Sequence, residues 1–181
     1  ILKKFIETES LPLAYMQTVE QWFLPLALEI SDKTSSHQGA FILGINGSQG
    51  SGKSTLASLL VLLLQEISGI RSINISLDDF YLTLEERKKL AASVHPLLVT
   101  RGVPGTHDVD LAIQTLIALK LKGEVSIPKF NKANDDRAAL EQWPKIEAPI
   151  EVIIIEGWCL GVGSQEDAEL LEAVNELETK E

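Results

Sequence analysis

The chain has 181 residues, of which 45% are hydrophobic and 23% are charged, and these values fit one globular α/β domain with a sizeable core. Its formal net charge of −10 argues against a general nucleic-acid-binding surface, because such a surface needs a basic stripe that contacts phosphates. The single cysteine, Cys159, excludes an internal disulfide, and no segment reads as a signal peptide or a membrane span. We therefore expect a cytoplasmic protein without a membrane partner.

The first part of the chain alternates between helical and strand patterns. Residues 11–30 are typical of an amphipathic helix that Pro25 kinks or ends, and a polar connection follows at residues 31–39. A short apolar run predicts a strand over residues 41–45. A longer apolar run without Gly or Pro predicts a helix over residues 53–68.

The remaining elements continue this alternation. Strands are expected over residues 72–77 and 150–155 and more weakly at 125–127, and helices over residues 84–92, 109–122 and 165–178. Thr83 and Glu86 form a capping-box pattern before the helix at 84–92, and Gly123 is expected to end the helix at 109–122. The run at 150–155 is rich in β-branched residues, which suits a central parallel strand.

Residues 47–54 carry the strongest motif of the sequence, Gly-Ser-Gln-Gly-Ser-Gly-Lys-Ser, which matches the phosphate-binding pattern G-x-x-x-x-G-K-S. Glycines let successive backbone N–H groups turn toward phosphate oxygens, the lysine reaches the β- and γ-phosphates, and the last serine is a Mg²⁺ ligand. We assign nucleotide binding to Gly47, Ser48, Gln49, Gly50, Ser51, Gly52, Lys53, Ser54 and Thr55, and catalysis also to Lys53.

A strand before this loop and a helix after it place the helix N-terminus at the phosphates. Together with the alternating elements, this predicts a P-loop NTPase-type three-layer α/β/α fold with a doubly wound, mostly parallel sheet. We expect one P-loop domain over residues 1–181. It would comprise an N-terminal helix at 11–30, a nucleotide-binding core at 41–160 and the start of a C-terminal helical segment at 165–181.

Acidic residues follow two of the expected strands, at the edge of the sheet where ligands bind. Asp78 is a candidate catalytic base that accepts the proton of an attacking hydroxyl, whereas Asp79 is the weaker candidate of the pair. The alternative is that the pair only caps a turn. Glu156 is a candidate Mg²⁺ ligand together with Ser54, the alternative being a solvated strand end, and Trp158 is interpreted as a packing residue.

Two polar loops supply cationic candidates for an anionic substrate. Arg101 and His107 lie in a Gly-Pro loop that enters the helix at 109–122, where Thr106 or Asp108 is also a candidate helix N-cap. A second cluster at residues 129–137 carries three cations, and the alternative for such a cluster is a solvated loop. Cations near the active edge of an acidic protein suit a small anionic substrate.

These motifs together resemble the D-glycerate 3-kinase-like P-loop kinases, which are grouped with phosphoribulokinase, uridine kinase and pantothenate kinase. The resemblance covers residues 11–178 and is carried by the stretches 47–55, 77–81, 100–108, 127–132, 136–137 and 155–159, with Asn-Glu-Leu-Glu at 175–178. It implies ATP-dependent phosphorylation of a small-molecule hydroxyl with Asp78 as general base. It also implies an acceptor pocket bordered by Asp78, Tyr81, Arg101, His107, Lys129 and Arg137.

The sequence departs from this family pattern in two respects. Asn131 stands where the family more often has Asp, which bears on an acceptor contact there. Family members also continue beyond the last of these stretches, through further strands and an arginine-bearing lid. By this comparison the chain corresponds to the N-terminal two thirds of such an enzyme.

The functional hypothesis is a kinase that uses ATP and Mg²⁺ and acts on a small molecule, with D-glycerate as the leading acceptor. Kinases for a nucleoside, for pantothenate or for a sugar phosphate remain alternatives, and so does a non-catalytic ATP-binding regulatory protein. An acceptor-side base at Asp78 favours the kinase, because a regulatory switch does not need one. The sequence predicts no nucleic-acid partner and leaves the oligomeric state open.

Overall fold

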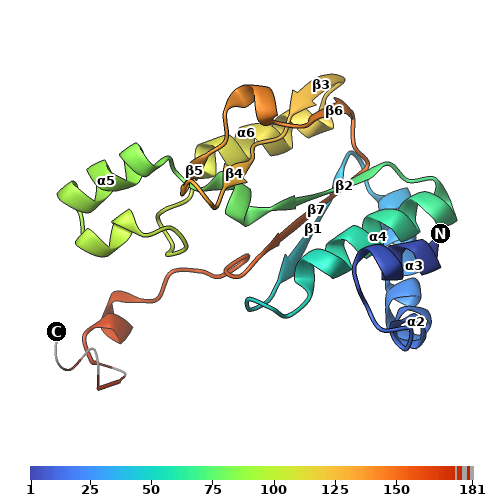
Figure 1. Ribbon diagram of the computed structural model, residues 1–181, viewed down its shortest axis with the longest axis horizontal. Coiled ribbons are helices and arrows are strands. Elements are labelled where there is room, and N and C mark those ends of the chain that lie inside the picture. The colour runs from blue at the N-terminus through green and yellow to red at the C-terminus, as the bar shows by residue number, and fades with distance from the viewer. Residues whose placement is uncertain (174, 177–178, 180–181) are drawn as a thin grey trace.

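The computed structural model describes residues 1–173, 175–176 and 179 (Figure 1). Its α-helices are α1 (Leu2–Thr8), α2 (Tyr15–Thr18), α3 (Leu24–Ser36), α4 (Lys53–Ser68), α5 (Leu84–Ser93) and α6 (Val109–Lys120). Its strands are β1 (Phe41–Asn46), β2 (Ser72–Ser76), β3 (Gly123–Ser126), β4 (Phe130–Asn131), β5 (Asp136–Arg137), β6 (Lys145–Ala148) and β7 (Val152–Gly157). Short 3₁₀ turns lie at Leu77–Phe80, Pro96–Val99, Leu140–Gln142 and Asp167–Leu170, and a π-helical segment at Val19–Phe23 joins α2 to α3.

The centre of the molecule is a three-stranded parallel sheet with the order β1-β7-β2. The β-branched strand β7 is in the middle, and its residues Val152, Ile153 and Ile154 are completely buried. Ile45 of β1 and Ser76 of β2 both pair with Glu156 of β7, so the carboxyl ends of the three strands lie level with one another. The expected central position of the last strand is therefore confirmed.

Helices cover both faces of this sheet, as Figure 1 shows. Ile154 points into a core that contains Leu60 and Leu64 of α4 together with residues of α3. Ile153 points to the opposite face and packs in a second core with Leu119 of α6. Because alternate residues of one strand feed two separate cores, the fold has three layers, and the predicted α/β/α class is confirmed.

The N-terminal helical region differs from the prediction. The expected helix at 11–30 consists of α2, the π-helical segment and α3, and it continues to Ser36 through the stretch predicted to be a polar connection. Pro25 does not end it, because this residue lies in the first turn of α3, where a missing N–H is tolerated. The hydroxyls of Thr34 and Ser35 donate to carbonyls one turn back, at 2.7 and 3.0 Å, so these polar side chains are satisfied within the helix. Helix α1 was not predicted.

The weak strand expected at 125–127 is β3, but it does not join the central sheet. It pairs antiparallel with β6 in a separate two-stranded sheet beside α6. Gly123 was expected to end α6, but it does not. The helix ends earlier, because Leu121 already has an extended backbone conformation. Gly123 is instead the first residue of β3, with a φ of 143°.

The helix expected at 165–178 is not present in the part that the structure describes. Only the short 3₁₀ turn Asp167–Leu170 forms there, and residues 174, 177 and 178 of that prediction lie outside the described residues. Leu171 is 84% exposed, so the segment has no core against which a helix could be stabilised. Over the described residues, no helix is both long enough and apolar enough to cross a bilayer.

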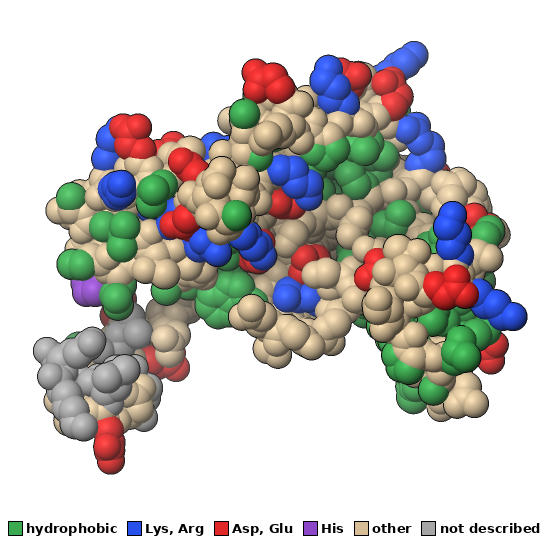
Figure 2. Space-filling view, in the orientation of Figure 1, with side chains coloured by type: hydrophobic (Ala, Val, Ile, Leu, Met, Phe, Trp, Pro, Cys, Tyr) green, Lys and Arg blue, Asp and Glu red, His purple; other side chains and the backbone are tan. Residues whose placement is uncertain are grey.

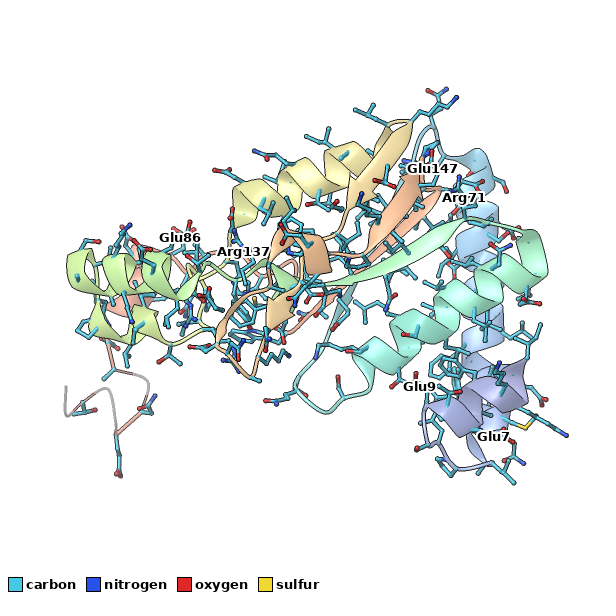
Figure 3. The ribbon with its side chains drawn as sticks, turned by 45° about the horizontal axis from the view of Figure 1, so that its top comes forward. Glu7, Glu9, Arg71, Glu86, Arg137 and Glu147 are labelled. Carbon is cyan, nitrogen blue, oxygen red and sulfur yellow. The ribbon has the colours of Figure 1, made fainter. Side chains whose placement is uncertain are left out.

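The two ends of the central sheet have different side chains around them (Figure 3). Arg71 precedes β2 at the amino ends of the strands, and its guanidinium donates to the carbonyl of Glu147 at 2.5 Å. Arg137 lies away from this pair, toward the carboxyl ends of the strands. The candidate functional residues cluster at the latter end, as expected for a parallel sheet.

Candidate active site

The phosphate-binding motif forms the connection from β1 to α4. The N–H of Gly47 donates to the carbonyl of Gly157 at 3.2 Å, which ties the loop to the end of β7. Gly52 is the N-cap of α4 with a φ of 86°, a left-handed conformation that side chains disfavour. A Cβ at Gly47 would lie 2.7 Å from the hydroxyl of Ser51, so a larger residue would require that hydroxyl to move. The glycines thus permit a loop that ends at the positive N-terminus of a helix.

Glu156, at the end of β7, faces the start of α4. Its Oε1 accepts a hydrogen bond from the Ser54 hydroxyl at 3.1 Å, and its Oε2 lies 3.8 Å from Nζ of Lys53. The residue is only 4% exposed, yet Oε2 has no hydrogen-bond partner. A buried carboxylate oxygen without a hydrogen bond is suited to a cation or to the water that such a cation carries.

These residues fit the Mg²⁺ that the motif implies. In the described part of the chain, no cluster of three or more acidic, His or Cys side chains could hold a metal by itself. Mg²⁺ commonly binds through one or two protein ligands, with phosphate oxygens and water as the others. Ser54 and Glu156 are the residues that would supply the protein ligands.

Asp78 lies in the 3₁₀ turn that follows β2 and accepts two strong hydrogen bonds. The Tyr81 hydroxyl donates to its Oδ1 at 2.8 Å, and Nζ of Lys132 donates to its Oδ2 at 2.7 Å. Burial raises the pKa of Asp78, but the hydrogen bonds and charges of Lys132, Tyr81 and Lys53 outweigh this, so the pKa lies below its usual range. Asp78 is therefore an ionised carboxylate near the phosphate loop.

Asp79 has different partners from its neighbour. Its Oδ2 accepts from Nζ of Lys129 at 2.5 Å, and its Oδ1 accepts from the backbone N–H of Phe130 at 3.2 Å. Both oxygens therefore hold strand β4 against the turn. Lys129, which was predicted to border the acceptor, is the ion-pair partner of Asp79 in this structure.

Tyr81 is held by aromatic and polar neighbours. Its ring packs 4.5 Å from the ring of His107 and 5.3 Å from that of Phe130, centroid to centroid. The guanidinium of Arg137 donates to the Tyr81 carbonyl at 3.1 Å and to a carboxylate oxygen of Asp108 at 2.8 Å. Burial lowers the pKa of His107, although the nearby Asp78 opposes this, so the imidazole is neutral at pH 7. His107 and Arg137 position the tyrosine in this structure.

The loop before α6 has the helix N-cap that the sequence allowed, and the contact of Arg101 with a substrate stays a prediction. Asp108 is the N-cap of α6 and accepts from the N–H of Leu111 at 3.0 Å, and Thr106 is completely buried. Arg101 forms an ion pair with Asp135 and lies 5.6 Å from the centre of the Phe130 ring. Its side chain is still 32% exposed and faces the cavity, so Arg101 both pins the loop and remains available to a ligand.

A cavity of about 920 Å³ brings most of these residues together. It corresponds to the hollow in the middle of the face shown in Figure 2, where acidic and basic side chains meet. The predicted site residues that line it are Ser48, Gln49, Gly50, Lys53, Ser54, Asp78, Tyr81, Arg101 and Glu156. Gly47, Ser51, Gly52 and Thr55 line a second cavity on the other side of the loop. His107, Lys129 and Arg137 do not line either cavity among the described residues, and their contact with an acceptor stays a prediction.

Lys132 and Trp158 line the first cavity but were not predicted to do so. The side-chain oxygen of Asn131 accepts the N–H groups of Ala133 and Asn134, at 3.0 and 3.2 Å, and this turn presents Lys132 to Asp78. Trp158 is 44% exposed, and its indole N–H donates to the carbonyl of Gly102 at 3.1 Å. The signal for Lys132 was its position in the cationic cluster, whereas nothing local to Trp158 distinguished a cavity residue from a packing residue.

The phosphate loop joins the first strand of the parallel sheet, β1, to helix α4. Carboxylates stand at the carboxyl ends of two neighbouring strands, Asp78 at β2 and Glu156 at β7. This arrangement defines a P-loop fold of the kinase type. The chain belongs to the Phosphoribulokinase / Uridine kinase family, whose family model matches residues 42–172. The predicted resemblance to this group is thereby confirmed.

Several relatives resemble the chain over most of its length. It is 35% identical over 159 residues to the chloroplastic D-glycerate 3-kinase of Arabidopsis thaliana, covering 77% of this chain and 35% of that protein. It is 42% identical over 145 residues to the uncharacterized kinase mug58 of Schizosaccharomyces pombe, covering 74% of this chain and 52% of that protein. A uridine kinase of Salmonella paratyphi B is 33% identical over 146 residues, covering 77% of this chain and 61% of that protein.

Among solved structures, the D-glycerate 3-kinase of Cryptococcus neoformans superimposes with a TM-score of 0.66 at 31% identity. The match covers 83% of this chain and 55% of that one. The chain thus spans between 35% and 52% of the length of the first curated relatives that it matches.

Proposed function

We propose that the protein is a kinase that transfers the γ-phosphoryl group of ATP to a hydroxyl of a small anionic metabolite, with D-glycerate as the acceptor. One observation supports this most directly. The phosphate loop, the buried carboxylate of Glu156 and the ionised carboxylate of Asp78 face the same cavity. A phosphate-binding group and an acceptor-side base are the two parts that phosphoryl transfer to a hydroxyl requires.

The roles of the residues follow from their chemistry. The glycine-rich loop binds the phosphates through its N–H groups, and Lys53 neutralises charge that develops on the transferred group. Ser54 and Glu156 are the proposed protein ligands of Mg²⁺, which when bound supplies further charge neutralisation at the phosphates. Asp78 orients the acceptor hydroxyl and accepts its proton, and Tyr81 holds the carboxylate of Asp78 in place through its 2.8 Å hydrogen bond.

The charge of the acceptor side supports an anionic acceptor. Arg101 and Lys132 line the cavity together with Asp78, and Lys132 forms an ion pair with Asp78. The planar fork of Arg101 suits a carboxylate, which D-glycerate carries and uridine lacks. The relatives named D-glycerate 3-kinase agree with this choice, whereas the uridine kinase relatives support a nucleoside acceptor as the second candidate.

The test is acceptor-dependent ADP release by the protein in the longest form that its gene encodes. D-glycerate, uridine, pantothenate and a panel of sugar phosphates are supplied with Mg²⁺ and ATP, and the phosphorylated products are identified by mass spectrometry. We expect D-glycerate to give the highest kcat/KM. Turnover with uridine alone would replace the proposed acceptor. ATP binding without turnover on any of these acceptors would favour a regulatory ATP-binding protein.

A further inference from the structure

A second cavity, of about 400 Å³, lies on the other side of the phosphate loop from Asp78 and Glu156. Among the described residues, Lys53 is the only one that lines both cavities. One wall of the second cavity is formed by the loop and the start of α4, including Gly52 and Thr55. The opposite wall comes from the N-terminal segment, through Leu11, Tyr15 and Phe23.

The two cavities are not equivalent for a nucleoside triphosphate at this loop. The reactive terminal phosphate has to face the cavity that contains Asp78, because the acceptor hydroxyl is activated there. The remainder of the nucleotide therefore leaves the loop in the other direction. The second cavity begins on that side, at Gly52 and Thr55.

The lining of the second cavity suits a planar aromatic ring. The rings of Tyr15 and Phe23 lie 5.9 Å apart, centroid to centroid, and are tilted by 44°. Ile45 and Leu56 add apolar surface, and Asn46 contributes an amide side chain, which offers both a hydrogen-bond donor and an acceptor. Aromatic rings stack on nucleic-acid bases of every kind, and the volume lies in the range of small-molecule sites.

We propose that this cavity binds the purine base and ribose of the nucleotide, and that α2 and the segments beside it form the wall for the base. The N-terminal helices lie beside α4 in Figure 1, and Tyr15 and Phe23 pack against the same core as residues of α4, so this core holds the wall in place. The proposal rests on the proposed function in one respect, namely that both require a nucleoside triphosphate at the loop.

The test compares the binding of MgATP with that of magnesium tripolyphosphate, measured by isothermal titration calorimetry. Tripolyphosphate carries the phosphates without a base, so the ratio of the two dissociation constants isolates the contribution of the nucleoside. For the unsubstituted protein we expect MgATP to bind at least tenfold more tightly. Tyr15→Ala should weaken MgATP binding by about tenfold and leave tripolyphosphate binding unchanged, whereas Tyr15→Phe, which keeps the ring, should retain the affinity.

A matched control is Leu26→Ala, which truncates an apolar side chain of α3 that packs against the same core but does not line the cavity. This variant should lower the melting temperature without changing the ratio of the two dissociation constants. Photo-crosslinking of the unsubstituted protein with 8-azido-ATP gives a result that does not depend on the folding of a variant. We expect the label in the peptide that contains Tyr15 and Phe23.

The outcomes separate the two proposals. If neither ATP nor tripolyphosphate binds, the proposed function and the base site both fail. If ATP binds more tightly than tripolyphosphate but Tyr15→Ala weakens both ligands equally, or the label lies outside the N-terminal segment, the base site is wrong and the proposed function stands. Equal affinity of the unsubstituted protein for the two ligands would likewise overturn the base site alone.

Discussion

At the residue scale, the neighbouring aspartates of the turn after β2 have separate surroundings. Both residues line the cavity, but the carboxylate of Asp78 lies between the side chains of Tyr81 and Lys132, whereas that of Asp79 is hydrogen-bonded to Lys129 and to the backbone of β4. Because Asp78 is ionised and its partners are side chains that can move, an acceptor hydroxyl can replace one of them. The contacts of Asp79 include a backbone N–H, which ties this residue to the fold.

Exchange of each aspartate for its amide separates catalysis from folding. Asp78→Asn should lower kcat by roughly a hundredfold or more, the effect usual for the loss of a positioned general base, with little change in the dissociation constant of ATP. Asp79→Asn is the matched control and should change kcat by less than severalfold while lowering the melting temperature. A large loss of kcat in Asp79→Asn together with an active Asp78→Asn would assign the base to the other residue.

Lys132 is one of the residues that lower the pKa of Asp78. Burial alone would raise the pKa of Asp78, and Lys132, Tyr81 and Lys53 together hold this pKa below its usual range. Lys132→Met removes the hydrogen bond and the charge, so the pKa of Asp78 should rise. The acid limb of the profile of kcat/KM against pH should shift to higher pH in this variant.

The depressed pKa of Asp78 also determines how the stability of the fold changes with pH. A carboxylate whose pKa is depressed in the folded state stabilises the fold above its unfolded pKa, and this stabilisation is lost as the pH falls through the folded pKa. Lys132→Met should therefore lose stability at neutral pH and show a weaker additional loss in acid. Lys122→Met, at an exposed lysine outside both cavities, is the matched control, and an NMR titration of the Asp78 carboxyl group measures the pKa directly. An unchanged pKa would show that Lys132 does not control the base.

At the element scale, a buried arginine holds together segments that are separated along the chain. Arg87 of α5 is completely buried, and its guanidinium donates to the carbonyls of Leu82, Val99 and Asp135 at 3.2, 2.6 and 2.6 Å. It also lies 3.1 Å from the carboxylate of Asp135, which is in turn paired with Arg101. Arg87 thus links α5 and the turn after it to the loop that presents Arg101 to the cavity.

Arg87→Met should destabilise the protein by about 3–5 kcal/mol, because the buried carbonyls and the carboxylate lose their donor. Urea unfolding measures this free energy. The neighbouring Lys88→Met, at an exposed position of the same helix, is the control and should change stability by less than about 0.5 kcal/mol. A loss below about 1 kcal/mol for Arg87→Met would show that water replaces the guanidinium.

At the scale of the whole molecule, charge is distributed unevenly. The chain carries a net charge of −10, whereas the cavity at the carboxyl ends of the sheet is lined by three cations, Lys53, Arg101 and Lys132, that balance its three carboxylates, Asp78, Asp79 and Glu156. An anionic nucleotide and an anionic acceptor are repelled less at this cavity than over the rest of the acidic surface, which favours binding there.

Nucleotide binding should therefore stabilise the whole domain. At a concentration of MgATP one hundred times its dissociation constant, mass action adds about 2.7 kcal/mol to the free energy of unfolding, which corresponds to a rise in melting temperature of roughly 5–10 °C. Lys53→Ala should reduce this rise strongly while leaving the melting temperature without ligand nearly unchanged. Lys33→Ala removes an exposed lysine that pairs only with Glu29 among the described residues, and it should keep the full rise. An equal rise in both variants would contradict the assignment of the loop.

Features that depend on local backbone chemistry were predictable from residue type and spacing. The sequence predicted the motif at 47–54, strand β1 before it, helix α4 after it and strand β2 beyond that helix. Glycine conformations, a continuous apolar run and β-branched residues each favour a local structure over a few neighbouring positions. The capping box at Thr83 and Glu86 is equally local, and both of its hydrogen bonds are present. The placement of Glu156 and Asp78 at one edge also followed, since parallel strands end at the same side of a sheet.

Contacts between side chains of distant segments became known from the fold and not from the sequence. Lys132 reaches Asp78, Arg101 reaches Asp135, and Lys129 pairs with Asp79 across intervals of 34 to 54 residues. The second cavity, the burial of Arg87 and the pairing of β3 with β6 likewise arise from contacts between distant parts of the chain. Residue type and spacing do not encode such contacts, because they depend on how the layers pack and on which donor reaches which acceptor.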